Sequence, residues 1–367
     1  MTNHHVDIAI VGAGMAGASL AAMIGARARV LLIEAEQYPG YHATGRSAAF
    51  WSETYGGPLV QPLTTASGAA LESGGYLVKR TCLHIADAAG RGALEALIAL
   101  MEAGGIAGAP LDRAALEAVI PGLAPAFAWG MSEPSTCDID VGGLHADYLA
   151  RARRAGVLSL VDAGVMAVER RAGGWRLETR AGTVDAPILV DAAGAWADGI
   201  AMMAGIVPLG IQPYRRTIVQ LATDPPAPHD LPLTMDAAGR FYFKPEAGGR
   251  LWLSPHDETP VLAHDVAPEE LDVAIAIERL EHVVDWRVEK RERAWAGLRS
   301  FAPDRAPVYG FDAAAPGFFW FAGQGGFGIQ TAPAAAMIGA ALLLGEGLPE
   351  AVAGIDVERY SPIRFRR

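Results

Sequence analysis

The sequence predicts an α/β fold of two domains, one formed around a parallel sheet and the other around an antiparallel sheet. The first observation behind this prediction is an apolar strand at 6–11, which leads into G-x-G-x-x-G at 12–17 and then into a helix of small residues. The second is a strand and Gly/Ala turn of the same kind at 188–196. The third is a β-rich, aromatic stretch between 214 and 300, which predicts a separate antiparallel unit.

Length and composition support two folded domains. The chain has 367 residues, of which 51% are hydrophobic and 19% are charged, so it is able to bury a large core. The net charge of −11 argues against a nucleic-acid partner, because such binding needs a basic surface. The chain has two cysteines, Cys82 and Cys137, which are too few for a disulfide framework, and this predicts a cytoplasmic location. The sequence has no spacing typical of metal ligands, so no metal site is expected.

Each glycine of the first motif has a physical role. Gly12 permits the tight turn, Gly14 lets the backbone approach a pyrophosphate, and Gly17 lets the helix pack closely against the strand. The helix that begins at Met15 and Ala16 offers unpaired N–H groups and the positive end of its dipole to the phosphates. The turn therefore predicts a phosphate-binding site.

An acid ends the second strand of the same unit. Glu34 follows the apolar strand 30–33 and lies about 20 residues after the first glycine, where a carboxylate accepts hydrogen bonds from a ribose diol. With Ala35 beside it, this acid completes the pattern of a Rossmann-like dinucleotide site. A membrane anchor is the alternative for 8–33, but two arginines interrupt the apolar run, so no integral membrane segment is expected.

The remaining elements are predicted from apolar periodicity, capping residues and turn formers. Helices are expected at 63–74, 91–104 and 144–156, with a short helix capped by Asp112 and ending at 121–122. Four strands predict a small antiparallel meander at 157–161, 164–171, 174–180 and 182–185. The second domain has strands at 214–222, 240–244, 250–253 and 290–300, and a helix at 268–281. The chain closes with a buried strand at 318–322, a glycine turn at 323–328 and an apolar helix at 332–345.

Three turns that follow strands, far apart in the sequence, decide between the dinucleotides. They lie at 12–17, 191–196 and 323–328. Three distant turns suit a long ligand that is bound deeply, which points to FAD instead of NAD. The FAD-binding domain is therefore discontinuous and is predicted to comprise 1–80, 140–210 and 305–367. The substrate-binding domain is predicted to comprise 81–139 and 211–304.

Five dispersed segments give the sequence a resemblance to a known family. They lie at 40–49, 212–216, 241–245, 295–301 and 324–331. Over nearly the whole chain, the sequence resembles the FAD-dependent glycine/D-amino-acid oxidase superfamily, and within it the D-arginine dehydrogenase branch. The resemblance implies a glutathione-reductase-type domain with non-covalently bound FAD. It places further FAD contacts at Thr44, Gly45, Arg46, Ser47, Ala48, Val165, Ala193, Gly194, Trp196, Arg299, Gly325, Gly326, Phe327, Gly328, Ile329 and Gln330.

The resemblance also implies how an amino acid is held. A carboxylate suits a bidentate cation, and the planar fork of arginine supplies one. The resemblance places Arg299 and Tyr242 in a carboxylate clamp, with Arg216 and Tyr55 in the same pocket. Adjacent residues of a strand face opposite sides, so Arg215 is expected to point away from the site. The other site residues are Gly326, Gln330 and Cys82.

These side chains also have ordinary structural alternatives. Arg299 is either a clamp residue or an arginine paired with a surface acid, and its place between Trp295 and Phe301 favours a buried charge that needs an anion. Tyr242 is either a clamp residue or a core tyrosine, and it faces away from the phenylalanines on each side. The segment 47–57 is either an aromatic lid with a glycine hinge or a static loop.

Cys82 marks a departure from the D-arginine dehydrogenase pattern, which has an acid there to bind the substrate guanidinium. A neutral residue removes the reason to prefer a cationic side chain. The predicted reaction is therefore FAD-dependent oxidation of D-amino acids with neutral or apolar side chains. It yields imino acids by hydride transfer from Cα to flavin N5, and water hydrolyses them to 2-oxo acids and ammonia. The expected electron acceptor is oxygen, a quinone or a carrier.

Other reactions are compatible with the same residues. A secondary amine, such as an N-methyl amino acid, or a 2-hydroxy acid reuses the carboxylate clamp. An aromatic hydroxylase has a similar FAD domain but requires NAD(P)H and has no need of the clamp. A non-catalytic FAD protein is the alternative from a different class.

Overall fold

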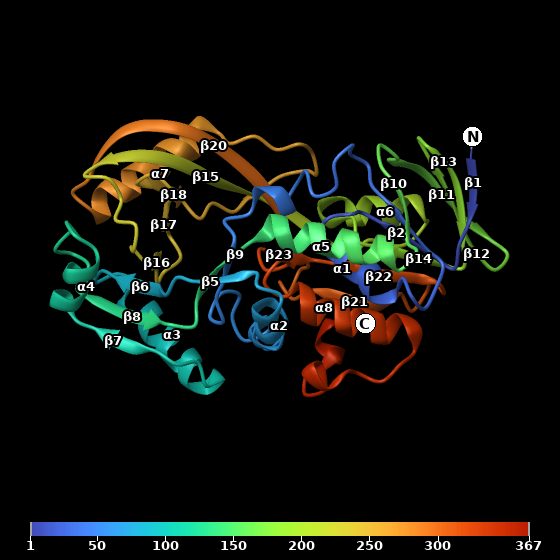
Figure 1. Cartoon of the computed structure of the whole chain (residues 1–367), viewed down its shortest axis with the longest axis horizontal. Coiled ribbons are helices and arrows are strands. Elements are labelled where there is room, and N and C mark those ends of the chain that lie inside the picture. The colour runs from blue at the N-terminus through green and yellow to red at the C-terminus, as the bar shows by residue number, and fades with distance from the viewer. Residues whose placement is uncertain (1, 366–367) are drawn as a thin grey trace.

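The parallel sheet predicted around the glycine motif forms the right half of the computed structural model, which describes residues 2–365 (Figure 1). Its strands run in the order β10 (Leu158–Leu160), β3 (Val30–Ile33), β2 (Ile8–Val11), β14 (Ile188–Asp191), β22 (Phe318–Ala322) and β21 (Val308–Phe311). Neighbouring strands are parallel except β21 and β22, which are antiparallel. Because β2, β14 and β22 are parallel, the three predicted glycine turns meet at one edge of the sheet.

Both faces of this sheet are buried, because successive strand residues point to opposite sides. Ile8 and Ile10 face one core, whereas Ala9 and Val11 face another. The first face is covered by α1 (Met15–Ile24), α5 (Val141–Arg154) and α8 (Ala332–Leu344). The second is covered by α6 (Ala197–Met203) and by a small four-stranded sheet. Burial on both faces explains why these strands are continuous apolar runs.

The small sheet corrects the predicted meander. Its strands are β1 (Thr2–His5), β13 (Gly182–Ala186), β12 (Gly174–Thr179) and β11 (Val165–Arg171). The last three pair antiparallel as predicted, but β1 was not predicted and pairs in parallel with β13. The predicted strand 157–161 forms β10 and pairs in parallel with β3 in the main sheet instead. The reason is the preceding helix α5, which provides the crossover that a parallel strand needs.

A second, longer sheet forms the left half of the molecule (Figure 1). Its path runs through β23 (Gln324–Gly325), β20 (Arg287–Phe301), β15 (Gln212–Asp224), β18 (Arg250–Ser254), β17 (Tyr242–Glu246), β16 (Leu233–Asp236), β6 (Cys82–Ala86), β8 (Trp129–Glu133) and β7 (Ala109–Leu111), and β19 (Thr259–Pro260) also pairs with β15. The sheet is antiparallel as predicted, except that β16 and β6 are parallel. Helix α7 (Glu270–Val283) packs on one face, against the core that contains Phe241 and Phe243.

The predicted helices are present, with shifts only at their ends. The helices not yet named are α2 (Gln61–Ser73), α3 (Arg91–Gly104) and α4 (Arg113–Val119). Asp112 caps α4 as predicted, because its Oδ1 accepts a hydrogen bond from the Ala115 N–H at 2.9 Å. Short 3-10 turns lie at η1 (Thr44–Arg46), η2 (Gly194–Trp196), η3 (Glu350–Val352), η4 (Val357–Tyr360) and η5 (Pro362–Phe365).

A third sheet of short strands lies between the two halves (Figure 1). It consists of β4 (Phe50–Trp51), β9 (Cys137–Ile139) and β5 (Leu77–Lys79).

Both cysteines of the chain are free and buried. Within residues 2–365, no helix combines the length and apolar character needed to cross a membrane. The exact bounds of the two domains stay a prediction.

Candidate cofactor and substrate site

The first glycine turn is shaped by contacts that only glycine permits. Gly12 has a φ of +101°, and a Cβ atom there would lie 2.4 Å from the carbonyl oxygen of Ala192. A Cβ atom at Gly17 would lie 1.8 Å from the carbonyl oxygen of Gly12. The turn after β2 is therefore pressed against the turn after β14, and α1 begins directly beside it.

Helix α1 begins without a side-chain cap. Its N-cap residue is Gly14, and among its first N–H groups that of Met15 donates to Thr44 Oγ1 at 3.0 Å. The uncapped helix start suits an anion. Glu34 is only 9% exposed, and its Oε2 accepts a hydrogen bond from the Ala13 N–H at 2.9 Å. The acid is therefore held at the edge of the glycine turn.

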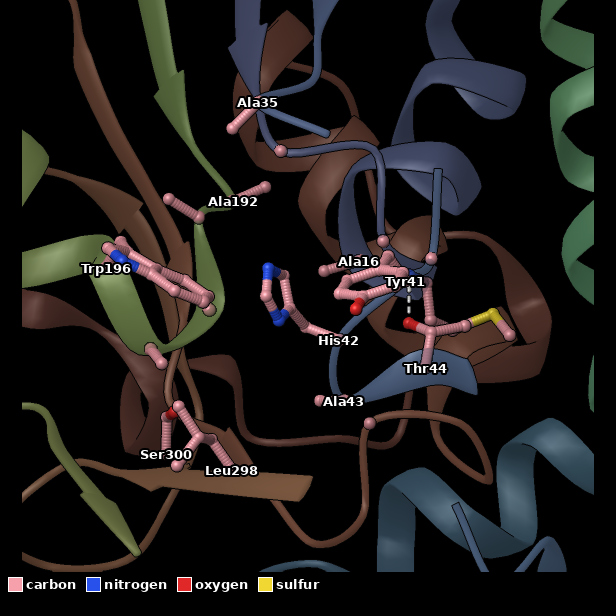
Figure 2. Close-up of a pocket in the computed structure, with 18 of the residues that line it drawn as sticks. Ala16, Ala35, Tyr41, His42, Ala43, Thr44, Ala192, Trp196, Leu298 and Ser300 are labelled. Atoms are coloured by element: carbon pink, nitrogen blue, oxygen red, sulfur yellow. Dashed lines mark hydrogen bonds between the residues drawn. The ribbon is translucent and has the colours of Figure 1, made fainter. Parts of the chain in front are cut away.

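A cleft of about 380 Å³ lies where the three turns meet (Figure 2). It is bounded by the ends of β2, β3, β14 and β22 and by the last residues of β20. Of the predicted FAD contacts, its lining includes Gly12, Gly14, Met15, Ala16, Glu34, Ala35, Thr44, Arg46, Ser47, Val165, Ala193, Gly194, Trp196, Arg299, Gly325, Gly326, Gly328 and Ile329. Segments from both ends and the middle of the chain therefore form one site.

Some predicted contacts lie beside the cleft without lining it. They are Gly17, Gly45, Ala48, Phe327 and Gln330. The Gly45 N–H donates to the carbonyl oxygen of Gly40 at 2.8 Å, which closes a turn in the cleft wall. Gln330 is 2% exposed, and its amide donates to the carbonyl oxygen of Tyr55 at 3.0 Å. These residues shape the walls, and their direct contact with FAD stays a prediction.

Two cleft residues that sequence reasoning missed are aromatic. The ring centroid of His42 lies 5.1 Å from that of Tyr41 and 4.6 Å from that of Trp196, and Figure 2 shows the imidazole between the other two rings. His42 Nε2 lies 3.0 Å from Glu36 Oε1. Both missed residues belong to the segment 40–49, which carries part of the family resemblance. That position in the sequence was the signal that could have identified them as cleft residues.

Arg46 has protein partners that the sequence did not indicate. Its guanidinium donates to the carbonyl oxygens of Val266 (2.9 Å) and Ala296 (3.2 Å) and pairs with Asp265. These contacts join the cleft wall at η1 to the second sheet. A hydrogen bond from Arg46 to FAD stays a prediction.

Arg299 and Arg216 lie on the same face of neighbouring strands. In the antiparallel pairing of β15 with β20, Arg299 stands opposite Tyr214. Arg216 stands opposite Gly297, so the two arginines are diagonal neighbours. Arg215 points to the opposite face, as predicted, and pairs with acids at the start of α7.

Arg299 makes no ion pair with any carboxylate in residues 2–365. Its Nη1 donates to the carbonyl oxygen of Gly326 at 3.1 Å. Arg216 differs, because its Nη2 lies 3.0 Å from Glu258 Oε1. The Nη1 of Arg216 lies 3.4 Å from the hydroxyl oxygen of Tyr55. A half-buried guanidinium without a counter-ion suits a ligand carboxylate.

Tyr242 lies on the same face of the sheet, on β17. It is 1% exposed, and its hydroxyl makes no hydrogen bond of good geometry with a described residue. Burial raises the pKa of the Tyr242 phenol, whereas the positive charges of Arg299 and Arg216 and a poorly aligned contact with the Ser254 side chain act against this rise. Phe241 and Phe243 point into the core under α7, as the strand alternation predicts. The Tyr242 hydroxyl is therefore a buried donor without a good protein acceptor.

An apolar cluster surrounds Tyr242. Its buried members are Ala48, Phe50, Cys82, Ile218, Leu233, Met235 and Tyr242. Burial, assisted by the charge of Glu133, raises the pKa of the Cys82 thiol well above its ordinary value, so the thiol stays protonated. Cys82, the residue at which the sequence is predicted to depart from the D-arginine dehydrogenase pattern, therefore lies in apolar surroundings.

A family model that matches most of the chain identifies the family to which it belongs. The family model described as FAD dependent oxidoreductase (DAO) matches residues 7–342. The chain belongs to the FAD dependent oxidoreductase family. The match includes the parallel sheet, the cleft and the second sheet.

Two known proteins show sequence similarity to this chain over part of their length. Hydrogen cyanide synthase subunit HcnC of Pseudomonas aeruginosa is 29% identical over 258 residues, which are 69% of this chain and 60% of that protein. Mitochondrial dimethylglycine dehydrogenase of Rattus norvegicus is 30% identical over 150 residues, which are 38% of this chain and 17% of that protein. The aligned part is therefore less than two thirds of either relative.

Solved structures share the fold over nearly the full chain. Glycine oxidase from Geobacillus kaustophilus has a TM-score of 0.84 at 23% identity, covering 98% of both chains. L-proline dehydrogenase from P. horikoshii has a TM-score of 0.85 at 20% identity, covering 100% of this chain and 99% of that one. The mixed α/β architecture with two domains is therefore the one found in these enzymes.

FAD is the cofactor of the family, and the cleft fits it. Gly12 leaves no room for a side chain at the turn, the uncapped start of α1 suits a pyrophosphate, and Glu34 offers a carboxylate to a ribose. The same cleft extends to Arg299 and Gly326. The cofactor site and the clamp are therefore continuous.

A buried acid holds the segment that precedes Tyr55. Glu133 is fully buried, and its carboxylate accepts hydrogen bonds from the Thr54 hydroxyl (2.6 Å) and the Glu53 N–H (2.7 Å). His84 Nε2 lies 3.1 Å from the same carboxylate. The first part of the predicted aromatic lid is therefore tied to β8, and movement of the rest stays a prediction.

We expect Glu133→Gln to lower the free energy of unfolding by about 3–5 kcal/mol, because it removes a buried carboxylate charge and leaves the groups that donate hydrogen bonds to it poorly satisfied. Burial raises the pKa of Glu133. The hydrogen bond with His84 and the electrostatic effect of His84 outweigh this rise and hold the pKa of Glu133 below its ordinary value. The stabilisation is therefore present above the pKa of the unfolded carboxyl and is lost as pH falls through the lower folded pKa. Urea unfolding at neutral pH and in acid measures both effects.

The control for this variant is Glu95→Gln on α3, where an exposed acid pairs with Arg91. We expect this control to change the free energy of unfolding by less than about 0.5 kcal/mol. Equal urea midpoints for Glu133→Gln and Glu95→Gln, or a difference that does not shrink in acid, contradict the role given to Glu133.

Proposed function

We propose that this protein oxidises D-amino acids with neutral or apolar side chains to imino acids. The observation that carries the proposal is the Arg299 guanidinium, which lines the cofactor cleft and has no carboxylate partner within residues 2–365. The buried Tyr242 hydroxyl lies on the same sheet face and makes no hydrogen bond of good geometry. A bidentate cation and a hydroxyl donor are groups that suit an α-carboxylate.

The contribution of the protein in this reaction is orientation. Arg299 and Tyr242 hold the carboxylate, so the Cα–H bond and the amine have fixed directions relative to the cleft. Bound FAD supplies the acceptor for the hydride that leaves Cα. Holding reactants in position contributes up to about 7–11 kcal/mol to lowering the barrier. The released imino acid is hydrolysed to a 2-oxo acid and ammonia.

The apolar cluster supports the preference for a neutral side chain. Cys82 lies in this cluster, where the D-arginine dehydrogenase pattern has an acid. Glu133 is on the neighbouring strand, but hydrogen bonds from Thr54 and Glu53 and the contact with His84 occupy its carboxylate. A cationic substrate side chain would be buried there without a carboxylate of its own, which costs about 2–5 kcal/mol.

A secondary amine is the second candidate substrate. The observation that favours N-methylated substrates is the similarity to dimethylglycine dehydrogenase, whose name describes a glycine with two methyl groups on its nitrogen, one more than a secondary amine carries. Such a substrate has the same carboxylate and uses the same clamp. The D configuration is supported by the five sequence segments that resemble enzymes of D-amino acids.

Anaerobic reduction of the bound flavin, followed as loss of its visible absorbance, tests the proposal. The panel contains D- and L-amino acids, N-methyl amino acids and 2-hydroxy acids, together with NADPH. We expect neutral D-amino acids to reduce the flavin fastest and D-arginine to be slow. Fastest reduction by D-arginine contradicts the side-chain preference, and reduction by NADPH alone contradicts amino-acid oxidation. Repeating the reaction with oxygen, a quinone or a carrier protein identifies the electron acceptor.

A further inference from the structure

His256 lies beside the clamp in a backbone conformation that L residues rarely adopt. It comes shortly after the end of β18 and has a φ of +55°. Its N–H donates to Ser254 Oγ at 3.1 Å, which supports the bend. Strained positions of this kind cost roughly 1–3 kcal/mol, and they cluster at functional sites.

The ring proton of His256 is placed by one contact. Nδ1 lies 2.6 Å from the carbonyl oxygen of Gly239. Because a carbonyl oxygen only accepts hydrogen bonds, Nδ1 carries the ring proton and Nε2 has a lone pair. Within residues 2–365, no hydrogen bond to Nε2 is present. The Nε2 lone pair therefore has no protein donor among the described residues.

The ring packs against both tyrosines of the substrate site. Its centroid lies 5.7 Å from that of Tyr242, at an interplanar angle of 77°, and 6.2 Å from that of Tyr55. Burial, together with the positive charges of Arg216 and Arg299, lowers the pKa of His256 to about 3. The imidazole is therefore a neutral acceptor at physiological pH.

The charged and titratable groups around His256 leave a positive surplus. They are Arg216 of β15, Tyr242 of β17, Arg299 of β20, Arg279 of α7, Tyr55, and Asp257 and Glu258 of its own segment. Asp257 accepts hydrogen bonds from the N–H and hydroxyl of Thr217, and Glu258 pairs with Arg216. Arg299 has no such partner among the described residues.

We propose that His256 contacts the substrate and that its Nε2 receives a proton from the ammonium group. The guanidinium groups of Arg216 and Arg299 are donors only, so they suit the carboxylate and not the ammonium. An amino acid arrives as a zwitterion, and its nitrogen must lose a proton before the C=N bond of the imino acid forms. In this step the ammonium N–H bond breaks, the Nε2–H bond forms, and the electron pair stays on the substrate nitrogen. The imidazolium then passes its proton to water.

Carboxylate binding favours this proton transfer. The charges of Arg216 and Arg299 oppose a proton on His256, and a bound carboxylate offsets part of that charge. Substrate binding and proton acceptance are therefore coupled. The inference rests on the proposed function, because it requires an amine-bearing carboxylic acid as the substrate.

Two substitutions separate proton acceptance from structural support. His256→Asn tolerates a positive φ and retains an amide near the position of Nδ1, but it removes Nε2. We expect it to lower kcat/KM for a neutral D-amino acid about 100-fold and to move the acid limb of the pH profile upward, toward the pKa of the free amine. His256→Gln places a neutral acceptor near the position of Nε2, so we expect KM to recover while kcat stays low.

Calorimetric binding gives a readout that does not depend on turnover. A simple carboxylate without an amine is expected to bind His256→Asn and the wild type with equal affinity. The control is His229→Asn, which replaces an exposed histidine. Thermal melts and flavin content establish that each variant is folded.

The outcomes distinguish the inference from the proposed function. An unchanged kcat/KM and pH profile in His256→Asn overturns the inference. Weaker binding of the simple carboxylate also overturns it, since His256 then only supports the clamp. If no amino acid or N-methyl amino acid reduces the wild-type flavin, the proposed function itself fails.

Discussion

We expect Arg299→Ala to lower kcat/KM for a neutral D-amino acid by about 30-fold to several thousandfold. Loss of one partner of a desolvated charge pair costs about 2–5 kcal/mol, and each 1.4 kcal/mol is a factor of ten. Arg299 makes no ion pair within residues 2–365, so the substrate carboxylate is its expected partner. The interaction is made in the ground state as well as in the transition state, so KM should rise more than kcat falls. Anaerobic flavin reduction across a range of substrate concentrations measures both parameters.

Matched variants on the same strand test whether this loss is specific. Arg299→Lys keeps the charge but loses the planar fork, so an intermediate loss is expected. Arg291→Ala removes an exposed arginine of β20 that pairs with Glu270, and we expect it to leave the kinetics unchanged. Equal kinetics for Arg299→Ala and Arg291→Ala contradict the carboxylate clamp.

The second large effect is expected from Gly12→Ala, which should yield protein with little or no bound FAD. A Cβ atom at Gly12 would lie 2.4 Å from the Ala192 carbonyl oxygen, and the φ of +101° is unfavourable for alanine. Both turns would have to move, and both line the cofactor cleft. The ratio of flavin to protein absorbance after purification measures the loss, and circular dichroism reports whether the chain is folded.

The control for this effect is Gly92→Ala in α3. Apart from its chain neighbours and the backbone of its own helix, no atom lies within 4 Å of a Cβ built at Gly92, and alanine favours a helix. We therefore expect normal FAD content and equal or slightly higher stability. If Gly12→Ala keeps its flavin and its melting temperature, the turn does not cradle the cofactor as described.

Local patterns in the sequence were sufficient for most elements and for the cofactor cleft. The glycine turn at 12–17 and the acid at Glu34 have a fixed relation to one strand and one helix, so their spacing predicts their geometry. The alternation around Tyr242 likewise predicted which face it occupies, and the core contacts of Phe241 and Phe243 confirm it. Such patterns depend on neighbours only a few residues away.

Strand partners were less predictable. The segment 157–161 has the composition of a meander strand, but it pairs with β3 because α5 carries it back to the parallel sheet. The unpredicted strand β1 likewise pairs with β13, far along the chain. Register and partner depend on long-range packing, which the residues of a single strand do not encode.

The sequence alone was enough to identify a dinucleotide cleft, FAD and a pair of candidate clamp residues. It did not show that Arg299 makes no ion pair within residues 2–365. It also did not show that the Glu133 carboxylate accepts hydrogen bonds from Thr54 and its neighbours. Nor did it single out His256, whose Nε2 lone pair follows from the distant carbonyl of Gly239. Counter-ions, tautomers and unpaired groups arise from contacts between residues far apart in the chain. Motif spacing therefore predicts where chemistry takes place, whereas packing determines which charges and lone pairs remain available for it.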